Sequence, residues 1–371
     1  MISMYSLGND LYTGKRSFQI IAKRKIWFAI AIFFILLSIA GFALKTPNLG
    51  IEFRGGSQFT VTGTENTSQG PAYEVIAEVG NDKAPRISSV GGSGIRVQTV
   101  QLDDQQTQAV KQALAEAYGV PETDVTSTYV GPSWGQDILN KAIRGMLIFM
   151  VAVSVVMIAY FRSWTIAVGA IGALLHDFIV TLGAYWLLGL EVTPATIIGI
   201  LTIMGYSLYD TVVVFDKVRE NTSQLRAQKK VTFEETANLA INQTLIRSLN
   251  TSITGLLPVA AVLVIGVGIF GADTLRDLAL VMFIGMLLST ISSIFLAAPL
   301  AVSLGMRNQD IKEHTNEVLK MREENDVRSK DLDNKVPIRE EQDTLAESAL
   351  EDRVAGTHKG NRAQPKRKKR K

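Results

Sequence analysis

Residues 26–44 read IWFAIAIFFILLSIAGFAL, a run without a single charged side chain. An α-helix needs about 20 such residues to cross the hydrocarbon core of a bilayer. Further apolar runs follow, so six membrane helices are predicted over residues 26–44, 142–160, 164–188, 192–215, 251–270 and 276–303. Of the 371 residues, 47% are hydrophobic and 20% are charged, and the charges gather in residues 304–371. The remainder is too apolar for a soluble globular enzyme.

The first run has a second interpretation, because basic residues precede it. Ser38-Ile39-Ala40 resembles the small-residue cleavage site of a secretory signal peptide. Five further spans follow, and a membrane anchor explains the run without any cleavage. We therefore expect an anchor.

Basic residues near the span ends predict the orientation, since Lys and Arg are enriched in cytoplasmic loops. They cluster in residues 1–25, in the link after the second span and in the link after the fourth, as Lys15, Arg16, Lys23, Arg24, Lys25, Arg162, Lys217, Arg219, Arg226, Lys229 and Lys230. The links at 189–191 and 271–275 contain none. We expect both termini in the cytoplasm, residues 45–141 outside it, and a multi-pass protein of the cytoplasmic membrane.

Residues 45–141 show the patterns of a small folded domain. The predicted strands are Gln58–Thr62, Arg86–Val90, Ile95–Val100 and Asp124–Val130, and the turn between the second and third is Gly91-Gly92-Ser93-Gly94. Helical spacing marks Ala72–Val79 and Gln105–Tyr118. The order β-α-β-β-α-β is the split βαβ pattern of a ferredoxin-like α+β domain. The predicted fold is thus an α-helical polytopic membrane protein with a small α+β domain after its first span.

The rest of the chain divides into a membrane bundle and a tail. Residues 142–305 should form a five-helix bundle, interrupted by an amphipathic segment, 216–250, that we expect along the cytoplasmic surface. Thr232 and Glu235 have the spacing of a capping box that begins a helix in this segment. Residues 306–371 are charged and poor in aromatics, so we expect disorder beyond an initial helical stretch.

Asp210 is the residue of the fourth span whose insertion into the membrane costs the most free energy. An ionised carboxyl at the centre of a membrane helix costs about 2.5–3.5 kcal/mol on insertion scales. Two interpretations are open: a protonated carboxyl that bonds helices together, or a carboxyl that takes up and releases a proton as the conformation changes. We favour the second interpretation.

Arg247, where the amphipathic segment enters the fifth span, is the expected partner of Asp210. A nearby guanidinium favours an ionised carboxylate, and its withdrawal favours the protonated form. The alternative is an arginine that extends to the membrane surface, as is common near span ends. His176 and Asp177 in the third span are either a second proton relay or a pair that bonds neighbouring helices.

Five glycines in the third and fourth spans are expected to allow close helix packing. They are Gly169, Gly172, Gly183, Gly199 and Gly205. The chain has no cysteine, which excludes disulfides, thiolate metal sites and a cysteine nucleophile. With no nucleophile–base pair, phosphate-binding loop or metal-binding cluster in the sequence, we expect neither an enzyme nor a cofactor or metal. The basic run 366–371 fits anionic lipid headgroups, and ribosomal RNA is the weaker alternative, so no specific nucleic acid is expected.

Several motifs together resemble the SecF family of the bacterial Sec protein-export machinery. They are Gly50-Ile51-Glu52-Phe53-Arg54-Gly55-Gly56 after the first span, Leu175-His176-Asp177 in the third, Gly205-Tyr206-Ser207 with residues 210–221 in the fourth, and residues 243–252 in the fifth. The resemblance covers about residues 20–305. Two positions depart from the family pattern: Tyr209 stands where Asn is usual, and Glu52 replaces the commoner Asp.

The resemblance implies an accessory subunit that pairs with SecD, joins the SecYEG channel and uses the proton-motive force to promote export of a translocating polypeptide. It assigns Asp210 and Arg247 to the proton path. Six spans would then form half of a twelve-span unit of the resistance-nodulation-division superfamily. The alternatives are a small-molecule efflux transporter of that superfamily, which usually carries two six-span halves in one chain, and a structural assembly subunit for which Asp210 would be dispensable.

Overall fold

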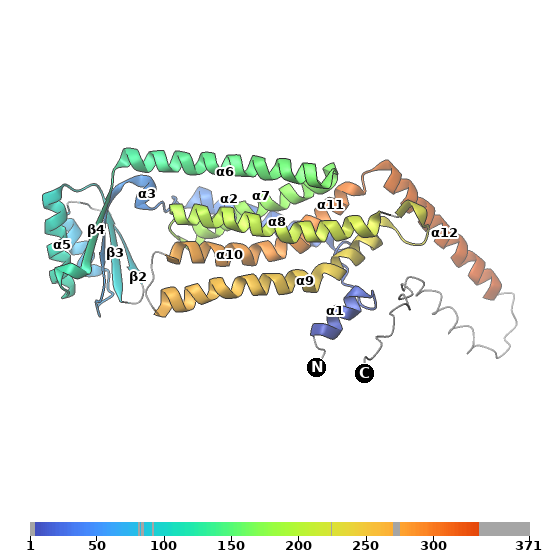
Figure 1. Cartoon of the computed structure of the whole chain (residues 1–371), viewed down its shortest axis with the longest axis horizontal. Coiled ribbons are helices and arrows are strands. Elements are labelled where there is room, and N and C mark those ends of the chain that lie inside the picture. The colour runs from blue at the N-terminus through green and yellow to red at the C-terminus, as the bar shows by residue number, and fades with distance from the viewer. Residues whose placement is uncertain are drawn as a thin grey trace, which may run out of the picture. The chain divides into compact units, whose positions relative to one another are not determined.

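The computed structural model of this chain describes residues 4–80, 82, 85–90, 93–223, 225–269 and 275–333. Residues up to 318 belong to one unit, and those from Leu319 belong to a second. Within the first unit, a bundle of long helices carries a four-stranded sheet at one end (Figure 1). We call this the sheet end, and the opposite end of the bundle the far end.

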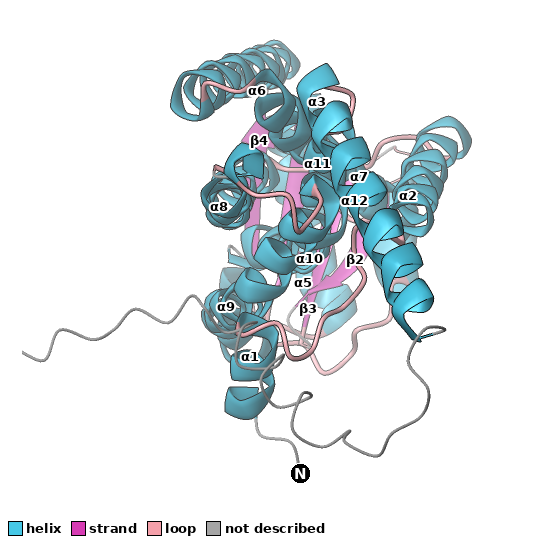
Figure 2. Cartoon of the chain, turned by 90° about the vertical axis from the view of Figure 1, so that its right-hand side faces the viewer, coloured by secondary structure: helices cyan, strands magenta, loops and turns pink. Residues whose placement is uncertain are grey.

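Six helical segments in the described residues are long and apolar enough to cross a membrane, as predicted. They are α2 (Arg24–Leu44), α6 (Pro132–Phe161), α7 (Trp164–Leu188), α8 (Pro194–Thr222), α9 (Phe233–Ala261) with the π-helical η3 (Val262–Ile269), and α10 (Arg276–Ser292) with the π-helical η5 (Ser293–Ala297) and α11 (Ala298–Gly305). α7, α8 and α10 pack against one another, while α2 and α6 lie at the periphery (Figure 2).

The second membrane helix is longer than the predicted span 142–160. α6 begins at Pro132, whose fixed φ and missing N–H suit the first turn of a helix. Its first turns carry Gln136, Asp137 and Asn140, which lower the local hydropathy. A prediction based on hydropathy therefore places the start of this helix too late. The α+β domain passes directly into α6 after β4 (Val125–Val130).

Residues 216–250 divide between the end of α8, a link and the first part of α9. α8 continues to Thr222, and residues from Phe233 onward belong to α9, which runs on into its span. Thr232 and Glu235 form the predicted capping box. The apolar face of this part of α9 consists of Ala237, Ala240 and Ile241, all fully buried. This part of α9 is amphipathic because its apolar face packs into the protein core.

The α+β domain has the predicted order of elements. They are β1 (Gly56–Val61), α4 (Gly70–Glu78), β2 (Arg86–Val90), β3 (Gly94–Thr99), α5 (Asp104–Tyr118), the 3₁₀ turn η1 (Glu122–Asp124) and β4 (Val125–Val130). The strands form one antiparallel sheet in the order β2-β3-β1-β4. Phe59, Val97 and Ile87 lie side by side on one face and are buried in a core shared with α4 and α5. Gly91 and Gly92 of the predicted turn lie outside the described residues.

A short helix, α3 (Ile51–Arg54), links α2 to β1 and ends at a pair of glycines. Gly55 has φ +77° and Gly56 has φ +131°, which is backbone that favours glycine. A Cβ at Gly55 would lie 2.6 Å from the Cα of Pro132, and one at Gly56 would overlap the carbonyl oxygen of Thr99. The glycine pair therefore lets this link pass against both α6 and β3.

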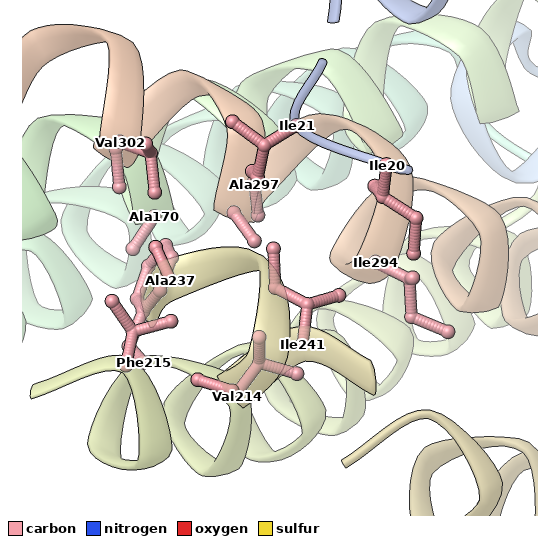
Figure 3. Packing of buried hydrophobic residues seen from close by; sticks show 14 of the residues in the cluster. Ile20, Ile21, Ala170, Val214, Phe215, Ala237, Ile241, Ile294, Ala297 and Val302 are labelled. Carbon is pink, nitrogen blue, oxygen red and sulfur yellow. The ribbon is translucent and has the colours of Figure 1, made fainter. Parts of the chain in front are cut away.

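The largest core of the bundle lies at the far end, where side chains from α6, α7, α8, α9, η5 and α11 meet (Figure 3). Its members include Ala170 of α7, Val214 and Phe215 of α8, Ala237 and Ile241 of α9, Ile294 and Ala297 of η5, and Val302 of α11. Ile20 and Ile21, which precede α2, fill the same core. The segment before the first span is thus part of the packed structure.

Two asparagines of α9 hold that segment in place. The side-chain oxygen of Asn238 accepts hydrogen bonds from the backbone N–H groups of Ile20 (3.0 Å) and Ile21 (3.1 Å). The side-chain oxygen of Asn242 accepts one from the N–H of Phe18 (2.8 Å). These bonds satisfy backbone groups in a stretch without regular structure, as burial requires. The preceding helix α1 (Met4–Tyr12) also packs against α9.

Glycines permit close helix contacts at most of the predicted positions. A Cβ at Gly169 or Gly172 would press on α11, one at Gly183 would overlap Ser38 of α2, and one at Gly199 would overlap Val281 of α10. At Gly205, none of the described residues lies within 4 Å of the place where a Cβ would be, so this glycine makes no close helix contact within the described part of the chain. Gly205 shares an exposed face of α8 with other exposed residues at helical spacing, which are Ile198, Thr202 and Tyr209.

The charged tail begins with the expected helix, α12 (Gln309–Asp333). His314 Nε2 lies 2.7 Å from the carbonyl oxygen of Gln228, which follows the short turn η2 (Leu225–Ala227). The disorder predicted farther along and the basic run 366–371 concern residues 334–371, which lie outside the described residues.

Candidate functional site

Asp210 lies inside the bundle, on the face of α8 that packs against α10 and η5. Its side chain is 5% exposed, and Oδ2 accepts a hydrogen bond of 2.8 Å from the hydroxyl of Ser293. Ser293 is fully buried and is the first residue of η5. Among the described residues, no ion pair reaches the Asp210 carboxyl. Within the described residues, the polar contact of this carboxyl is therefore the hydroxyl of Ser293.

A second carboxyl, that of Asp177, is buried between α7 and α8. It is 2% exposed; its Oδ2 accepts a hydrogen bond of 2.8 Å from Ser207 Oγ, and its Oδ1 lies 3.2 Å from His176 Nδ1. Asp177 therefore joins α7 to α8 through Ser207, while His176 contacts its sequence neighbour Asp177 on the same helix. The relay role stays a prediction.

α8 connects the two carboxyls. Ser207 and Asp210 are three residues apart on this helix and so lie on the same side of it. Polar groups consequently run from Asp177 on α7, through Ser207 and Asp210 on α8, to Ser293 on η5. A hydroxyl can both donate and accept a hydrogen bond, so these serines can satisfy a carboxyl in its ionised or its protonated form.

The Asp210 partner sits where the helix geometry changes. π-helical turns are rare and are frequent at functional sites. η5 starts at Ser293 and is followed by Pro299, which has no N–H to continue an α-helical ladder. The wider π-helical turn sets the position of the Ser293 hydroxyl against α8.

Arg247 does not contact Asp210. The two residues lie at similar depth, since α8 and α9 are antiparallel neighbours and the Tyr206 hydroxyl donates to the carbonyl of Thr251 (2.7 Å). Asp210 is one turn beyond Tyr206, and Arg247 is one turn before Thr251. Arg247 is nevertheless exposed, and no hydrogen bond or ion pair joins it to Asp210 in the part of the chain that the structure describes. The expected pairing is absent from this arrangement because the two side chains leave their helices on different faces.

Arg247 belongs to a polar exposed face of α9 that also contains Asn250 and Thr254. Two serines of the same helix, Ser248 and Ser252, are buried and face the bundle. Exposed polar groups at membrane depth are unfavourable against lipid tails. This face is therefore suited to contact another protein.

Sequence reasoning missed the hydroxyl partners of the two aspartates. Ser207 carried a usable signal, because its spacing of three residues from Asp210 places it on the same helix face. Ser293 carried a weaker one, as part of the pair Ser292-Ser293 within an apolar run. Neither signal identifies which carboxyl each serine would contact.

Two family models match the chain. The model described as "Protein export membrane protein SecD/SecF, C-terminal" matches residues 109–307, and the model "SecD/SecF GG Motif" matches residues 40–64. The second match contains the glycine pair that passes against α6 and β3. The first contains both aspartates, Arg247 and Ser293.

Curated relatives and a solved structure agree with these matches. A protein translocase subunit SecF of Streptomyces coelicolor is 41% identical over 323 residues, covering 87% of this chain and 86% of that protein. Its counterpart in Mycobacterium tuberculosis is 40% identical over 330 residues, covering 86% and 74%. The crystal structure of SecDF, described as a translocon-associated membrane protein, from Thermus thermophilus superposes with a TM-score of 0.69 at 30% identity. The superposition covers 78% of this chain and 38% of that longer chain.

Proposed function

This chain belongs to the SecF family, so it is a multi-pass, Sec-associated translocase subunit with a SecD-like partner, and we propose that with this partner it uses the proton-motive force to promote protein export through SecYEG. The observation that carries the proposal is the buried carboxyl of Asp210. An ionisable residue within a membrane helix is expensive, and the usual reason for it is a role in transport.

The surroundings of Asp210 suit a carboxyl that changes its protonation state. Ser293 can donate to the ionised form and can accept from the protonated form, so neither state leaves the carboxyl unsatisfied. Asp177 and Ser207 extend this polar path toward α7. His176, which contacts Asp177, is the second element of the proposed relay.

Arg247 is proposed to move toward Asp210 in one conformation and away from it in another. It lies at the depth of Asp210 but on an exposed face of α9. A rotation of α9 that turned the guanidinium toward α8 would favour an ionised carboxylate, and the reverse rotation would remove that effect. Proton transfer is thereby coupled to a movement of helices.

The SecD-like partner is proposed to cover the polar face formed by Arg247, Asn250 and Thr254. Burial against another protein supplies these groups with hydrogen-bond partners that lipid cannot offer. The exposed face of α8 that contains Gly205 and Tyr209 adjoins α9 and would belong to the same contact. The superposition is in keeping with this, since the SecDF chain is far longer than the part matched here.

In the proposed orientation both termini are cytoplasmic and the α+β domain lies outside the cytoplasmic membrane. The domain would contact the emerging polypeptide, and the basic run 366–371 would contact anionic headgroups on the cytoplasmic side.

The proposal is tested with sealed inner-membrane vesicles that contain SecYEG, the SecD-like subunit and this chain. Release of a secreted substrate is measured with and without an imposed proton gradient. We expect the gradient to increase release only when the chain is present. Equal release with and without the chain, or gradient-driven extrusion of a hydrophobic dye in place of a protein, would reject the proposal.

A further inference from the structure

A group of charged side chains gathers where the α+β domain meets the sheet end of the bundle. The backbone of residues 48–50 pairs with the α7–α8 loop through Gly50 N–H to Val192 O (2.9 Å) and Val192 N–H to Asn48 O (2.8 Å). This pairing brings Glu52 of α3 close to Glu191 of the loop. A Cβ at Gly50 would overlap Glu52 Oε2 and would lie 3.1 Å from Glu191 Oε1. Two carboxyl groups therefore converge on one glycine.

Glu191 is bonded to the sheet, whereas Glu52 is not. Gln98 Nε2 donates to Glu191 Oε1 (2.5 Å), and Arg96 Nη1 lies 3.6 Å from Glu191 Oε2. Glu52 Oε2 is shielded from solvent and has no hydrogen-bond partner within the described residues. An ionised oxygen in such a place would have neither water nor a hydrogen-bond donor to stabilise its charge. Burial therefore costs the ionised carboxyl more free energy than the protonated carboxyl.

The electrostatic surroundings favour the same state. Burial raises the pKa of the Glu52 carboxyl, and the carboxylates of Glu191 and Asp277 raise it further. The backbone N–H of Glu52 and the guanidinium of Arg96 oppose that shift without cancelling it. The other charged or titratable groups that line the adjoining clefts are Arg54 of α3, Tyr73 of α4, Asp82, Arg86 of β2, Tyr185 of α7 and Arg276 of α10.

Solvent reaches this carboxyl pair on the side of Glu191, which lines an open cleft. The cleft, of about 490 Å³, is lined by residues that include Glu191, Asp277, Arg96 and Arg276. Glu52 lies on the link between α2 and the glycine pair that leads into the α+β domain.

We propose that Glu52 is a proton-binding residue outside the membrane core, and that its proton holds the α3 link docked against the α7–α8 loop. Loss of the proton places a second negative charge next to Glu191, on a carboxyl whose Oε2 has no hydrogen-bond donor within the described residues, and releases the link. The inference deepens the proposed function, on which its role in export rests, because it gives proton binding a direct effect on the α+β domain.

The sign of the pH dependence follows from linkage. The docked state binds the proton more tightly than the released state, so docking is complete at low pH and weakens as the pH rises through the raised pKa. An acidic outer side therefore favours the docked domain.

The test measures a distance in the full chain, reconstituted in lipid nanodiscs. Since the chain has no cysteine, spin labels are attached through Gln105→Cys on α5 and Leu188→Cys at the end of α7, both exposed positions. The distance distribution is recorded by pulsed electron resonance from pH 4.5, the ordinary pKa of a Glu carboxyl, to about pH 8. We expect the ratio of docked to released molecules to fall by up to about tenfold per pH unit within the responsive window.

Glu52→Gln keeps the size of the side chain and cannot ionise, so it should retain the low-pH distribution at every pH. Glu78→Gln, at an exposed position on α4, should respond as the unmodified chain does. A pH response of Glu52→Gln equal to that of the unmodified chain, or an unmodified chain without any response, would overturn the inference. Asp210→Asn should leave the distance response intact, so failure here is distinguishable from failure of proton coupling at Asp210.

Discussion

The two buried aspartates differ in their contacts. Asp177 touches both Ser207 and His176, so its carboxyl is held on both oxygens. Asp210 touches Ser293 through one oxygen. A carboxyl held at several points serves well as a bond between helices, whereas one held by a single hydroxyl can change its proton content with less rearrangement. This contrast favours Asp210 as the residue that exchanges a proton.

Replacement of Ser293 by Ala tests whether this hydroxyl matters. The Asp210 carboxyl would lose its hydrogen bond, and leaving a buried polar group unsatisfied costs about 1–3 kcal/mol. We expect a lower midpoint of thermal unfolding in detergent and a weaker effect of the proton gradient on export. Ser154→Ala is the matched control, because Ser154 Oγ donates to the Met150 carbonyl of its own helix. Equal behaviour of the two variants would show that Ser293 is unimportant.

The sequence indicates which residues are energetically unfavourable in a membrane helix, but it does not indicate what those residues contact. Asp210 and His176-Asp177 stand out because charges are rare in membrane helices. The partner of Asp210 lies 83 positions away, and nothing local specifies which face of the last span meets α8. Opposite charge alone predicts the pairing of Asp210 with Arg247. In this structure Asp210 is buried inside the bundle, whereas Arg247 lies on an exposed face of α9.

At the scale of elements, local patterns predict helices and strands well and their ends less well. The spans and the split βαβ order follow from apolar runs and alternation, which are local properties. The start of α6 at Pro132 was missed because polar first turns lower the hydropathy. The periodicity of the first part of α9 predicts one apolar face, but it does not show whether lipid or protein covers that face.

Two glycine substitutions separate packed from open helix faces. Gly183→Ala should overlap Ser38 of α2 and destabilise the fold by about 1–3 kcal/mol, which is the usual cost of overpacking. Gly205→Ala meets open space and should stabilise its helix by roughly 0.5–1 kcal/mol. Thermal unfolding in detergent, without the partner subunit, measures both. The reverse order of stability would contradict the packing of α2 on α7.

Replacement of Asn238 by Leu tests the attachment of the segment before α2. The N–H groups of Ile20 and Ile21 would lose their acceptor, at a cost of about 1–3 kcal/mol each for a buried group. We expect a cysteine placed at the buried Leu11 to become reactive toward a thiol reagent. Asn250→Leu, an exposed change on the same helix, should leave position 11 protected. Protection in both variants would mean that the segment is held by other contacts.

At the scale of the whole molecule, the orientation in the membrane follows from the basic residues and is open to a direct test. Single cysteines are introduced at Gln105 of the α+β domain and at the exposed Lys229 beyond α8. A membrane-impermeant maleimide should label position 105 in intact cells and position 229 only after permeabilisation. The opposite pattern would reverse the orientation and the direction of proton flow.

Proton coupling itself is tested most directly by Asp210→Asn in vesicles that contain the SecD-like partner and SecYEG. The amide keeps the size of the side chain and can accept from Ser293, but it cannot take up and release a proton. Asp216→Asn, on the same helix where the Tyr160 hydroxyl donates to the carboxylate, is the matched control. Release of a secreted substrate is measured with and without an imposed proton gradient. We predict that Asp210→Asn inserts and binds its partner normally yet loses the gradient-dependent gain, which Asp216→Asn keeps; a full gain in Asp210→Asn would show that this carboxyl is structural.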